Sequence, residues 1–222
     1  MKAALAIRRE AELRNVQALL HFTQASNVPS IVTNGLLPRS ELISRGLNAD
    51  ASSRFRLDDR DDAVSVSVSA VNWEMFDAKR RKLARQTDWV ILALDPSILW
   101  TRPCKFYHRS AARKDMKNHR GRLDGPWAFL KMFEDTSPTS RFTGASYRYD
   151  TGIPDCLTTS PDAEVQVFGT IPPERIIEGW VARPYTRDFL LAQFSKISDG
   201  LDRDILVRDF SPRFSNGYAS WG

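Results

Sequence analysis

The chain carries a carboxylate inside an otherwise apolar stretch, at Glu164. Side chains from Asp162 to Gly169 alternate as in a short strand with two faces: Ala163, Val165 and Val167 on one, and Glu164, Gln166 and Phe168 on the other. A carboxylate on the second face is either solvated or turned toward a ligand cleft, where it acts as a base or stabilises positive charge. The strand alone leaves both interpretations open.

Two further groups of polar residues lie where ligands commonly bind. His21 and Thr23 end a short apolar stretch, and Asn27 precedes a helix whose first N–H groups favour an anionic or ribose-bearing ligand. Ser67 lies on the polar face of an alternating stretch, and Asn72 follows that stretch. The structural alternatives are a histidine at the edge of the core and a solvated serine face.

Arginines provide a third candidate group. Arg54, Arg56 and Arg60 lie in a long polar stretch, and a guanidinium holds a pyrophosphate through two parallel hydrogen bonds, which a lysine does not match. The spacing to the following strand and the Arg-x-Asp pattern formed with Asp58 favour Arg56. The alternative is a set of solvated loop charges balanced by the neighbouring aspartates.

Positive charge is concentrated in one part of the chain. The net charge is +5, but the segment from Arg102 to Arg122 alone carries +7, which leaves −2 for the remainder. A basic segment on a nearly neutral body is typical of proteins that bind a phosphate backbone. A solvated helix face is the other interpretation of such a segment.

Length and composition indicate one folded domain over residues 1–222. A hydrophobic content of 42%, with six Trp and twelve Phe, excludes a disordered chain, and no apolar run reaches membrane-spanning length. Early charges at Arg8 and Arg9 argue against a signal peptide. Two cysteines without metal-ligand spacing, Cys104 and Cys156, favour reduced thiols in the cytoplasm. The sequence has no Gly-rich dinucleotide motif, no P-loop and no metal-ligand cluster.

The order of predicted elements is mixed, which indicates an α+β fold. Helices are expected at residues 3–17, with Leu5, Leu13 and Val16 on the buried face, and at 28–33, 72–85, 109–120, 126–133 and 186–197. Strands are expected at residues 18–23, 63–69, 89–94, 105–107, 162–169, 176–181 and 204–210. Residues 37–62 and 134–160 are expected to form long loops.

Together these residues resemble one known family. The motifs are His21-Phe22-Thr23 with Asn27 and Gly35-Leu36-Leu37, then Arg56-Leu57-Asp58, then Ala63-Val64-Ser65-Val66-Ser67 with Asn72 and Met75-Phe76, and finally Ala163-Glu164-Val165-Gln166-Val167-Phe168-Gly169. In this order they resemble the DarT family of nucleic-acid ADP-ribosyltransferase toxins. The resemblance is strongest over residues 17–182 and follows an N-terminal helix within residues 1–16.

The resemblance implies an ADP-ribosyltransferase fold, with two small β-sheets around an NAD cleft and helices outside. It implies NAD+ as a co-substrate, no metal, and Glu164 as the catalytic glutamate, with Arg56 contacting the phosphates and assisting catalysis. The residues expected to bind NAD are His21, Thr23, Asn27, Arg56, Ser67 and Asn72. The residues expected to contact the acceptor are Tyr147, Arg148 and Tyr149 in the loop at 134–160, and Arg109 and Arg113 in the basic segment.

The resemblance predicts transfer of ADP-ribose from NAD+ to a nucleobase in single-stranded DNA. The protein would then be the toxin of a toxin–antitoxin or phage-defence system, with a cognate antitoxin and no membrane partner. Two departures leave the acceptor open: the stretch Ala70-Val71-Asn72-Trp73 lacks the proline that many relatives have before the asparagine, and Ser110 stands where many have asparagine. RNA bases, a protein side chain, and a non-catalytic nucleic-acid-binding module are the alternatives.

Overall fold

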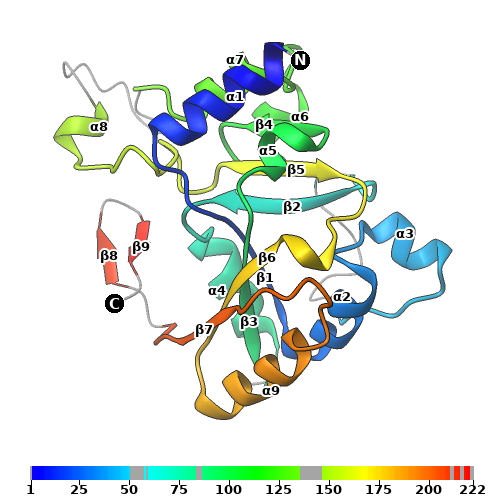
Figure 1. Ribbon diagram of the computed structural model, residues 1–222. Coiled ribbons are helices and arrows are strands. Elements are labelled where there is room, and N and C mark those ends of the chain that lie inside the picture. The colour runs from blue at the N-terminus through cyan, green and yellow to red at the C-terminus, as the bar shows by residue number, and fades with distance from the viewer. Residues whose placement is uncertain are drawn as a thin grey trace.

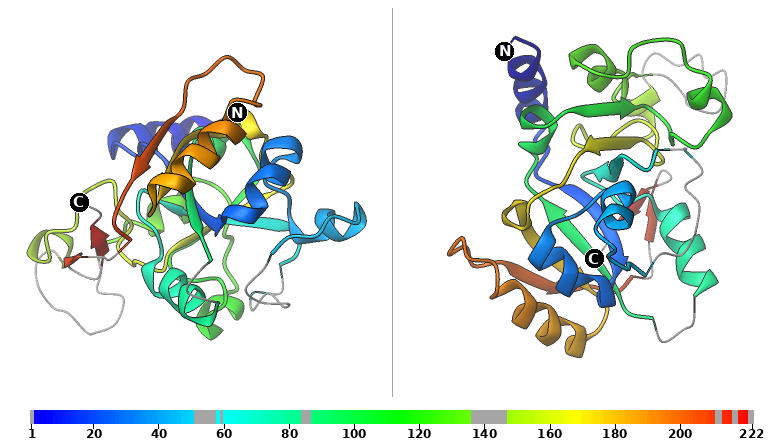
Figure 2. Two further views of the ribbon diagram at one scale, coloured as in Figure 1. Left: turned by 90° about the horizontal axis from the view of Figure 1, so that it is seen from below. Right: turned by 90° about the vertical axis from the view of Figure 1, so that its right-hand side faces the viewer.

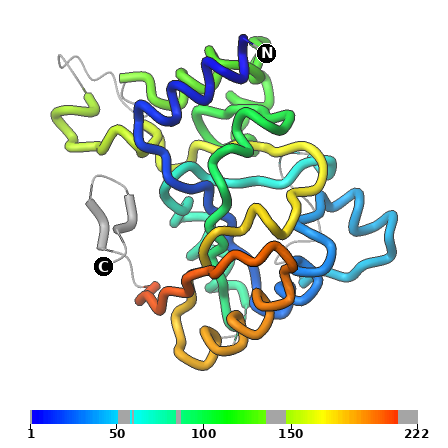
Figure 3. Tube along the Cα trace, viewed as in Figure 1, coloured from blue at the N-terminus to red at the C-terminus, as the bar shows by residue number. Residues whose placement is uncertain are grey.

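A computed structural model of the chain describes residues 2–50, 58, 60–83, 87–135, 147–210, 213–215 and 218–220. The helices in these ranges are α1 (Lys2–Leu13), α2 (Val28–Asn34), α3 (Arg39–Ser44), α4 (Trp73–Lys82), α5 (Ile98–Thr101), α6 (Lys114–Lys117), α7 (Pro126–Lys131), α8 (Tyr147–Asp150) and α9 (Pro184–Phe194). The strands are β1 (Leu19–Gln24), β2 (Ala63–Val68), β3 (Trp89–Leu94), β4 (Cys104–Tyr107), β5 (Glu164–Phe168), β6 (Ile176–Val181), β7 (Asp204–Val207), β8 (Arg213–Ser215) and β9 (Tyr218–Ser220). Figures 1 and 3 show the path of the chain through them. Of the helices in the described ranges, none is long and apolar enough to cross a membrane.

Seven strands form one sheet in the order β4-β5-β2-β1-β3-β6-β7, and β8 and β9 form a separate hairpin. Neighbours in the large sheet are antiparallel, except for the parallel pair β6 and β7. At the centre, β1 and β2 are joined by only two residue pairs, Leu19 with Val68 and Leu20 with Ser67. The α+β class is therefore confirmed, and the two small sheets expected from the sequence are two halves of one sheet with a narrow join (Figure 1).

The half formed by β4, β5 and β2 has one apolar and one polar face. Its valines pack in a core with Ile7 of α1, Leu99 of α5 and Phe129 of α7, which lie on the same side of this half (Figure 1). Because side chains alternate along a strand, the intervening residues point to the opposite face. That second face carries Ser65, Ser67, Lys105, Tyr107, Glu164 and Gln166.

The half formed by β1, β3, β6 and β7 is covered on both faces. Val28 of α2 and Leu190 of α9 belong to the core on one side, and Phe76 of α4 belongs to the cluster on the other. Figure 2 shows α4 and α9 on opposite sides of these strands. Because β3 is buried on both faces, its sequence is a continuous apolar run instead of an alternating one.

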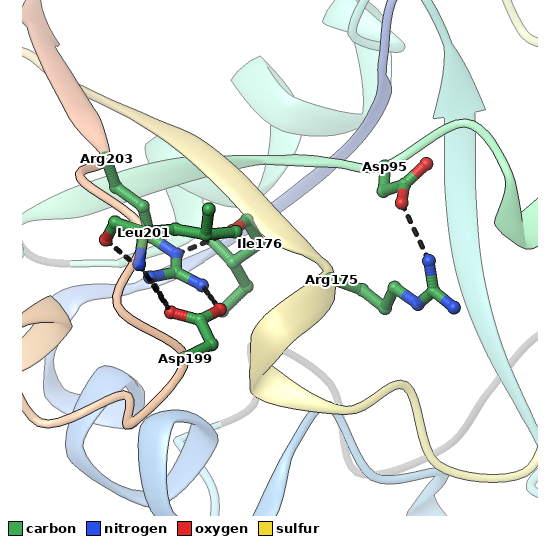
Figure 4. A network of polar contacts seen from close by, with 6 residues as sticks. All are labelled: Asp95, Arg175, Ile176, Asp199, Leu201 and Arg203. Atoms are coloured by element: carbon green, nitrogen blue, oxygen red, sulfur yellow. Dashed lines mark hydrogen bonds and ion pairs between the residues drawn. The ribbon is translucent and has the colours of Figure 1, made fainter.

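A buried arginine ties β7 to the start of β6. Arg203 is almost fully buried and donates to the carbonyl oxygens of Ile176 at 2.6 Å and Leu201 at 3.1 Å, and its guanidinium pairs with Asp199 (Figure 4). Each of these contacts takes the place of a hydrogen bond that the guanidinium would make to water. The charge of Arg203 is therefore compensated inside the protein.

A second ion pair joins the segment before β6 to the end of β3. Arg175 Nη1 lies 2.7 Å from the carboxylate of Asp95 (Figure 4). Burial by itself would raise the pKa of Asp95, but hydrogen bonds from Ser97 and the charge of Arg175 outweigh it and hold that pKa below its usual value. The carboxylate therefore stays ionised at neutral pH and keeps this pair intact.

The first helix differs from the sequence prediction in its length and in the face it buries. α1 ends at Leu13 and buries Ile7 and Ala11, whereas Leu5 and Leu13, expected in the core, are exposed. The prediction from the leucine positions therefore chose the wrong face of the helix. The small Ala11 allows α1 to approach its neighbours closely, and charged pairs cover the outer side.

Two expected loops and one expected helix also differ. The loop at 37–62 contains α3, the loop at 134–160 contains α8, and the helix expected at 109–120 is reduced to α6. By contrast, α2 ends before Gly35 as its sequence predicted. Gly35 has φ +84°, and a Cβ there would lie 2.5 Å from the carbonyl oxygen of Ile171, so this position requires glycine.

The aromatic cluster under β1 is expected to dominate the stability of that strand. Phe76 is fully buried, and its ring centroid lies 5.0 Å from that of Phe22, next to His21, and 5.5 Å from that of Trp89. Replacing Phe76 by alanine should lower the free energy of unfolding by about 3–5 kcal/mol, measured by urea denaturation. The exposed Leu13→Ala is the control, with an expected change within about 0.5 kcal/mol; equal losses in both variants would contradict this account of the core.

Candidate active site

Glu164 is held by two hydrogen bonds at the start of β5. Its Oε1 accepts from the Ser65 hydroxyl of β2 at 2.6 Å, and its Oε2 accepts from the Ala111 backbone N–H at 3.0 Å. The side chain is half-buried on the polar face of the sheet. Donors on both oxygens fix the orientation of the carboxylate. The strand with two different faces, expected from the sequence, is therefore confirmed.

His21 on β1 links the half of the sheet formed by β1, β3, β6 and β7 to the surroundings of Glu164. Its Nδ1 lies 3.0 Å from the carbonyl oxygen of Ser65, beyond the two pairs that join β1 to β2. Because a carbonyl oxygen can only accept, this contact places the proton on Nδ1. Ser65 thus links His21 to Glu164, through its carbonyl on one side and its hydroxyl on the other.

Asn27 and Thr23 form a support beside this histidine. Asn27 Nδ2 donates to Thr23 Oγ1 at 3.1 Å and to the carbonyl of Asp50 at 3.0 Å, while its Oδ1 accepts from the Asp50 N–H at 2.8 Å. Asn27 is at the N-cap position of α2, but its side chain makes no capping hydrogen bond. Since both ends of the amide are engaged within the protein, Asn27 shapes the site by holding Asp50.

Ser67 lies further along the polar face, on β2, and Asn72 follows that strand at the start of α4. Ser67 is half-exposed on β2, on the same face as Ser65. Asn72 is largely buried, and its Oδ1 accepts from the N–H of Met75, which makes Asn72 the N-cap of α4. The capping contact gives Asn72 a structural reason to be present.

Tyr107 is a site residue that the sequence did not reveal. It is paired with Glu164 across β4 and β5, so the two side chains are neighbours on one face. Burial raises the pKa of Tyr107; the charge of Arg60 lowers it, and the carboxylates of Glu164 and Asp58 raise it, with a net rise. The hydroxyl is therefore protonated at neutral pH and is a hydrogen-bond donor beside Glu164.

The basic segment lines the surface next to Tyr107. An open depression of about 480 Å³ lies here, bordered by residues that include Arg60, Lys105, Tyr107, Lys117 and Arg122. Among the three arginines proposed to face phosphates, Arg60 is the one that the structure describes, and it borders this depression. Arg54 and Arg56, including the predicted phosphate contact of Arg56, lie outside the described residues.

The two arginines expected to contact the acceptor differ in exposure. The Arg109 side chain is mostly buried, and its Nη1 lies 3.7 Å from Asp115. Arg113 is about half exposed, lies 3.5 Å from Asp115 and 3.6 Å from Asp162, and borders a second open depression of about 520 Å³. Arg113 is therefore accessible to a ligand, whereas Arg109 mainly organises the turn before α6.

Tyr147, Arg148 and Tyr149 form the helical turn α8. Arg148 is buried, and its guanidinium donates to three groups of the protein: Thr159 Oγ1 at 2.9 Å, and the carbonyl oxygens of Pro154 and Leu157 at 2.8 Å each. The expectation that Arg148 grips the acceptor does not fit this burial, because its donors already hold the following turn. Tyr149 is exposed and presents an aromatic face to solvent.

The cysteines have no catalytic position here. Both Cys104 and Cys156 are free, and burial raises the pKa of Cys104 to about 12, which keeps it a thiol at neutral pH. Over the part of the chain that the structure describes, no three His, Cys, Asp or Glu side chains are grouped so as to hold a metal ion.

Comparison with solved structures gives the same fold. The structure is similar to Thermus sp. 2.9 DarT in complex with NAD+, with a TM-score of 0.56, 12% identity, and coverage of 86% of this chain and 95% of that chain. It is similar to Thermus sp. 2.9 DarT in complex with ADP-ribosylated ssDNA, with a TM-score of 0.56, 13% identity, and coverage of 87% and 95%. It is also similar to Thermosipho africanus DarTG in complex with ADP-ribose, with a TM-score of 0.51 and 13% identity; the match covers 86% of this chain and spans 50% of that one.

Sequence comparison identifies the family. A search of curated proteins gives no match. The family model described as "ssDNA thymidine ADP-ribosyltransferase, DarT" matches residues 20–208, which include His21, Ser65, Tyr107 and Glu164. Because this match covers most of the chain, the protein belongs to the DarT family of ssDNA thymidine ADP-ribosyltransferases.

Proposed function

We propose that this chain transfers ADP-ribose from NAD+ to a thymidine base in single-stranded DNA, with Glu164 as the catalytic carboxylate. The observation that carries the proposal is the connection from His21 through Ser65 to Glu164 across the join of the two half-sheets. The family match and the likeness to DarT structures with NAD+ and with ADP-ribosylated ssDNA support it.

The chemistry explains why a fixed carboxylate is needed. The bond between the ribose C1 and the nicotinamide nitrogen breaks, nicotinamide leaves with the electron pair, and C1 gains oxocarbenium character. A carboxylate beside C1 stabilises that positive charge, and the donors Ser65 and Ala111 hold Glu164 in place for it. A ring nitrogen of the base then bonds to C1, and its proton passes to the carboxylate.

On the NAD+ side of Glu164 we place His21 and Thr23, because they lie on β1 where its pairing with β2 has ended. Ser67 extends the polar face toward the same place. Asn27 supports this side through Asp50, and Asn72 supports it by starting α4. Arg56 keeps its proposed role in contacting the phosphates and assisting catalysis, with NAD+ as co-substrate and no metal in the reaction.

On the acceptor side we place Arg113, Tyr149 and the rest of the basic segment. Arginine side chains neutralise phosphates, and an exposed tyrosine stacks on an unpaired base, which suits a single strand. Tyr147 adjoins Tyr149 on the same turn. RNA is the second candidate acceptor, because Ser110 and the missing proline before Asn72 depart from the family pattern and because stacking and phosphate contacts do not require deoxyribose.

We further propose that the chain acts as a toxin in the cytoplasm, where NAD+ and DNA are both present. Modified bases would block copying of the host DNA, so a cognate antitoxin is expected to accompany it. The likeness to a structure named DarTG supports such a pairing.

Glu164→Gln should abolish transfer while keeping the size of the side chain. Wild-type protein with NAD+ and a thymidine-containing single-stranded DNA oligonucleotide should add one ADP-ribose unit, seen by intact mass. The variant should react at least about 100-fold more slowly, because the charge that stabilises the transition state is gone. Glu178→Gln on β6 is the matched control and should retain the wild-type rate.

The same assay with an RNA oligonucleotide, and a melting measurement with NAD+, complete this experiment. Three outcomes would change the proposal. Full activity of Glu164→Gln would exclude Glu164 as the catalytic carboxylate. Modification of an RNA oligonucleotide of equal sequence, without modification of DNA, would move the acceptor to RNA. If neither polymer gains mass while NAD+ still raises the melting temperature, a protein acceptor becomes the better explanation.

Ser65→Ala should lower kcat without unfolding the protein. The half-exposed hydroxyl donates to Glu164 at 2.6 Å, and its loss lets the carboxylate rotate and leaves one oxygen without its donor. We expect kcat to fall about tenfold to a hundredfold, measured at saturating NAD+ and oligonucleotide. Ser195→Ala, at the end of α9, is the control for loss of a hydroxyl; an unchanged kcat in Ser65→Ala would show that this contact is dispensable.

Induced expression of the wild-type chain in a bacterial host should stop growth and leave ADP-ribose on the host DNA. The Glu164→Gln variant should be tolerated at the same protein level, because it binds but does not modify DNA. Growth curves and detection of ADP-ribose on purified DNA measure the two effects. Equal growth arrest by both forms would mean that toxicity does not arise from the transferase reaction.

A further inference from the structure

Gln166 is a fully buried amide two residues beyond Glu164 on the same face of β5. It is 0% exposed, and its Nε2 donates to the carboxylate of Asp58 at 2.7 Å, across 108 positions of sequence. Its Oε1 is also buried and, within the described part of the chain, accepts no hydrogen bond. One end of the amide is therefore well paired and the other is unsatisfied.

An unsatisfied buried oxygen destabilises a fold, and an apolar side chain of the same length would avoid that cost. Packing therefore does not account for glutamine at position 166. The contact that requires the amide is its hydrogen bond to Asp58, which is stronger than a neutral one because the acceptor is charged. We therefore interpret the hydrogen bond that fixes the position of Asp58 as the reason for an amide at position 166.

Asp58 lies on the wall of the open depression beside Glu164. Arg60 and Tyr107 border the same depression, and all three side chains lie near enough to interact electrostatically at the Tyr107 hydroxyl. Lys105, paired with Gln166 across β4 and β5, borders it too. The Gln166 contact therefore anchors Asp58 on the wall that Arg60 and Tyr107 also border.

The depression lies on one side of Glu164 and His21 on the other. In the strand order, β4 with Tyr107 and Lys105 lies beyond β5, whereas β2 and β1 with His21 lie on the opposite side. Both co-substrates must reach Glu164. Since the His21 side is assigned to NAD+, the cations around the depression are placed for the other polyanion, the acceptor strand.

We propose that Gln166 is a positioning residue for the acceptor: by holding Asp58 it keeps Arg60 and Tyr107 oriented for a phosphate and nucleoside of the single strand next to Glu164. This inference rests on the proposed function. It assigns to Gln166 no contact with either substrate, and it predicts an effect on the oligonucleotide that is separate from any effect on NAD+.

Gln166→Met tests this directly, because methionine fills the same space without the amide. We expect the KM for a thymidine-containing DNA oligonucleotide to rise about tenfold, with the KM for NAD+ unchanged within about twofold. The melting temperature should stay at or above that of the wild type, since the unsatisfied oxygen is gone. Gln193→Met on α9 replaces another largely buried glutamine and should leave both KM values unchanged.

Exchanging the amide and the carboxylate between positions 166 and 58 distinguishes a positioning role of Gln166 from a packing role. Gln166→Glu places a second carboxylate against Asp58 and should raise the oligonucleotide KM further than Gln166→Met does. Adding Asp58→Asn supplies an amide donor to that carboxylate and should recover at least half of the loss on a logarithmic scale. Absence of recovery, equal rises in both KM values for Gln166→Met, or a loss that tracks a fall in melting temperature would each overturn the inference.

Oligonucleotide binding without NAD+ separates this inference from the proposed function. Fluorescence anisotropy of a labelled single-stranded DNA should give a Kd for Gln166→Met about tenfold above that of the wild type. If the wild type modifies no oligonucleotide, the proposed function fails, and this binding comparison still decides the role of Gln166. An unchanged Kd would overturn the inference, even for an active wild-type enzyme.

Discussion

The site depends on the narrow join between β1 and β2. Because these strands pair at only two positions, the carbonyl of Ser65 lies beyond the paired region and accepts from the His21 ring, while the Ser65 hydroxyl donates to Glu164. A complete ladder between the strands would satisfy that carbonyl with a backbone N–H group in place of the His21 ring. The incomplete pairing therefore allows one serine to contact both His21 and Glu164.

In the proposed arrangement, the same strands also separate the two substrates. Glu164 lies between β2, which leads toward His21, and β4, which leads toward Tyr107 and the basic depression. Its second oxygen is bound by the N–H of Ala111, the residue at which the basic segment turns away from β4. The carboxylate is thus in contact with both sides of the site. This arrangement suits the proposed reaction, in which one group first stabilises the positive charge on the ribose C1 and then receives a proton from the acceptor.

Local patterns in the sequence predicted most strands, including the strand with two different faces that carries Glu164. Alternation placed Glu164 opposite the valines of its own strand, and a continuous apolar run marked β3, because these signals depend only on nearest neighbours. The sequence could not show that β4 pairs with β5, so Tyr107 and the Ala111 N–H were missed. Nor could the sequence show that Arg148 is buried, because that burial depends on carbonyls of the following turn. The helix expected at 109–120 is shortened to α6, and the Ala111 N–H of this segment is bound by Glu164 instead.

The most direct test of this account is a crystal structure of the protein with a non-hydrolysable NAD+ analogue. We predict that the ribose next to the nicotinamide lies within hydrogen-bond distance of Glu164, on the His21 side of β5, with Ser65 still bound to the carboxylate. An analogue bound in the depression beside Tyr107, or at a place without contact to Glu164, would contradict the assignment of the two sides and the central role of the join between the half-sheets.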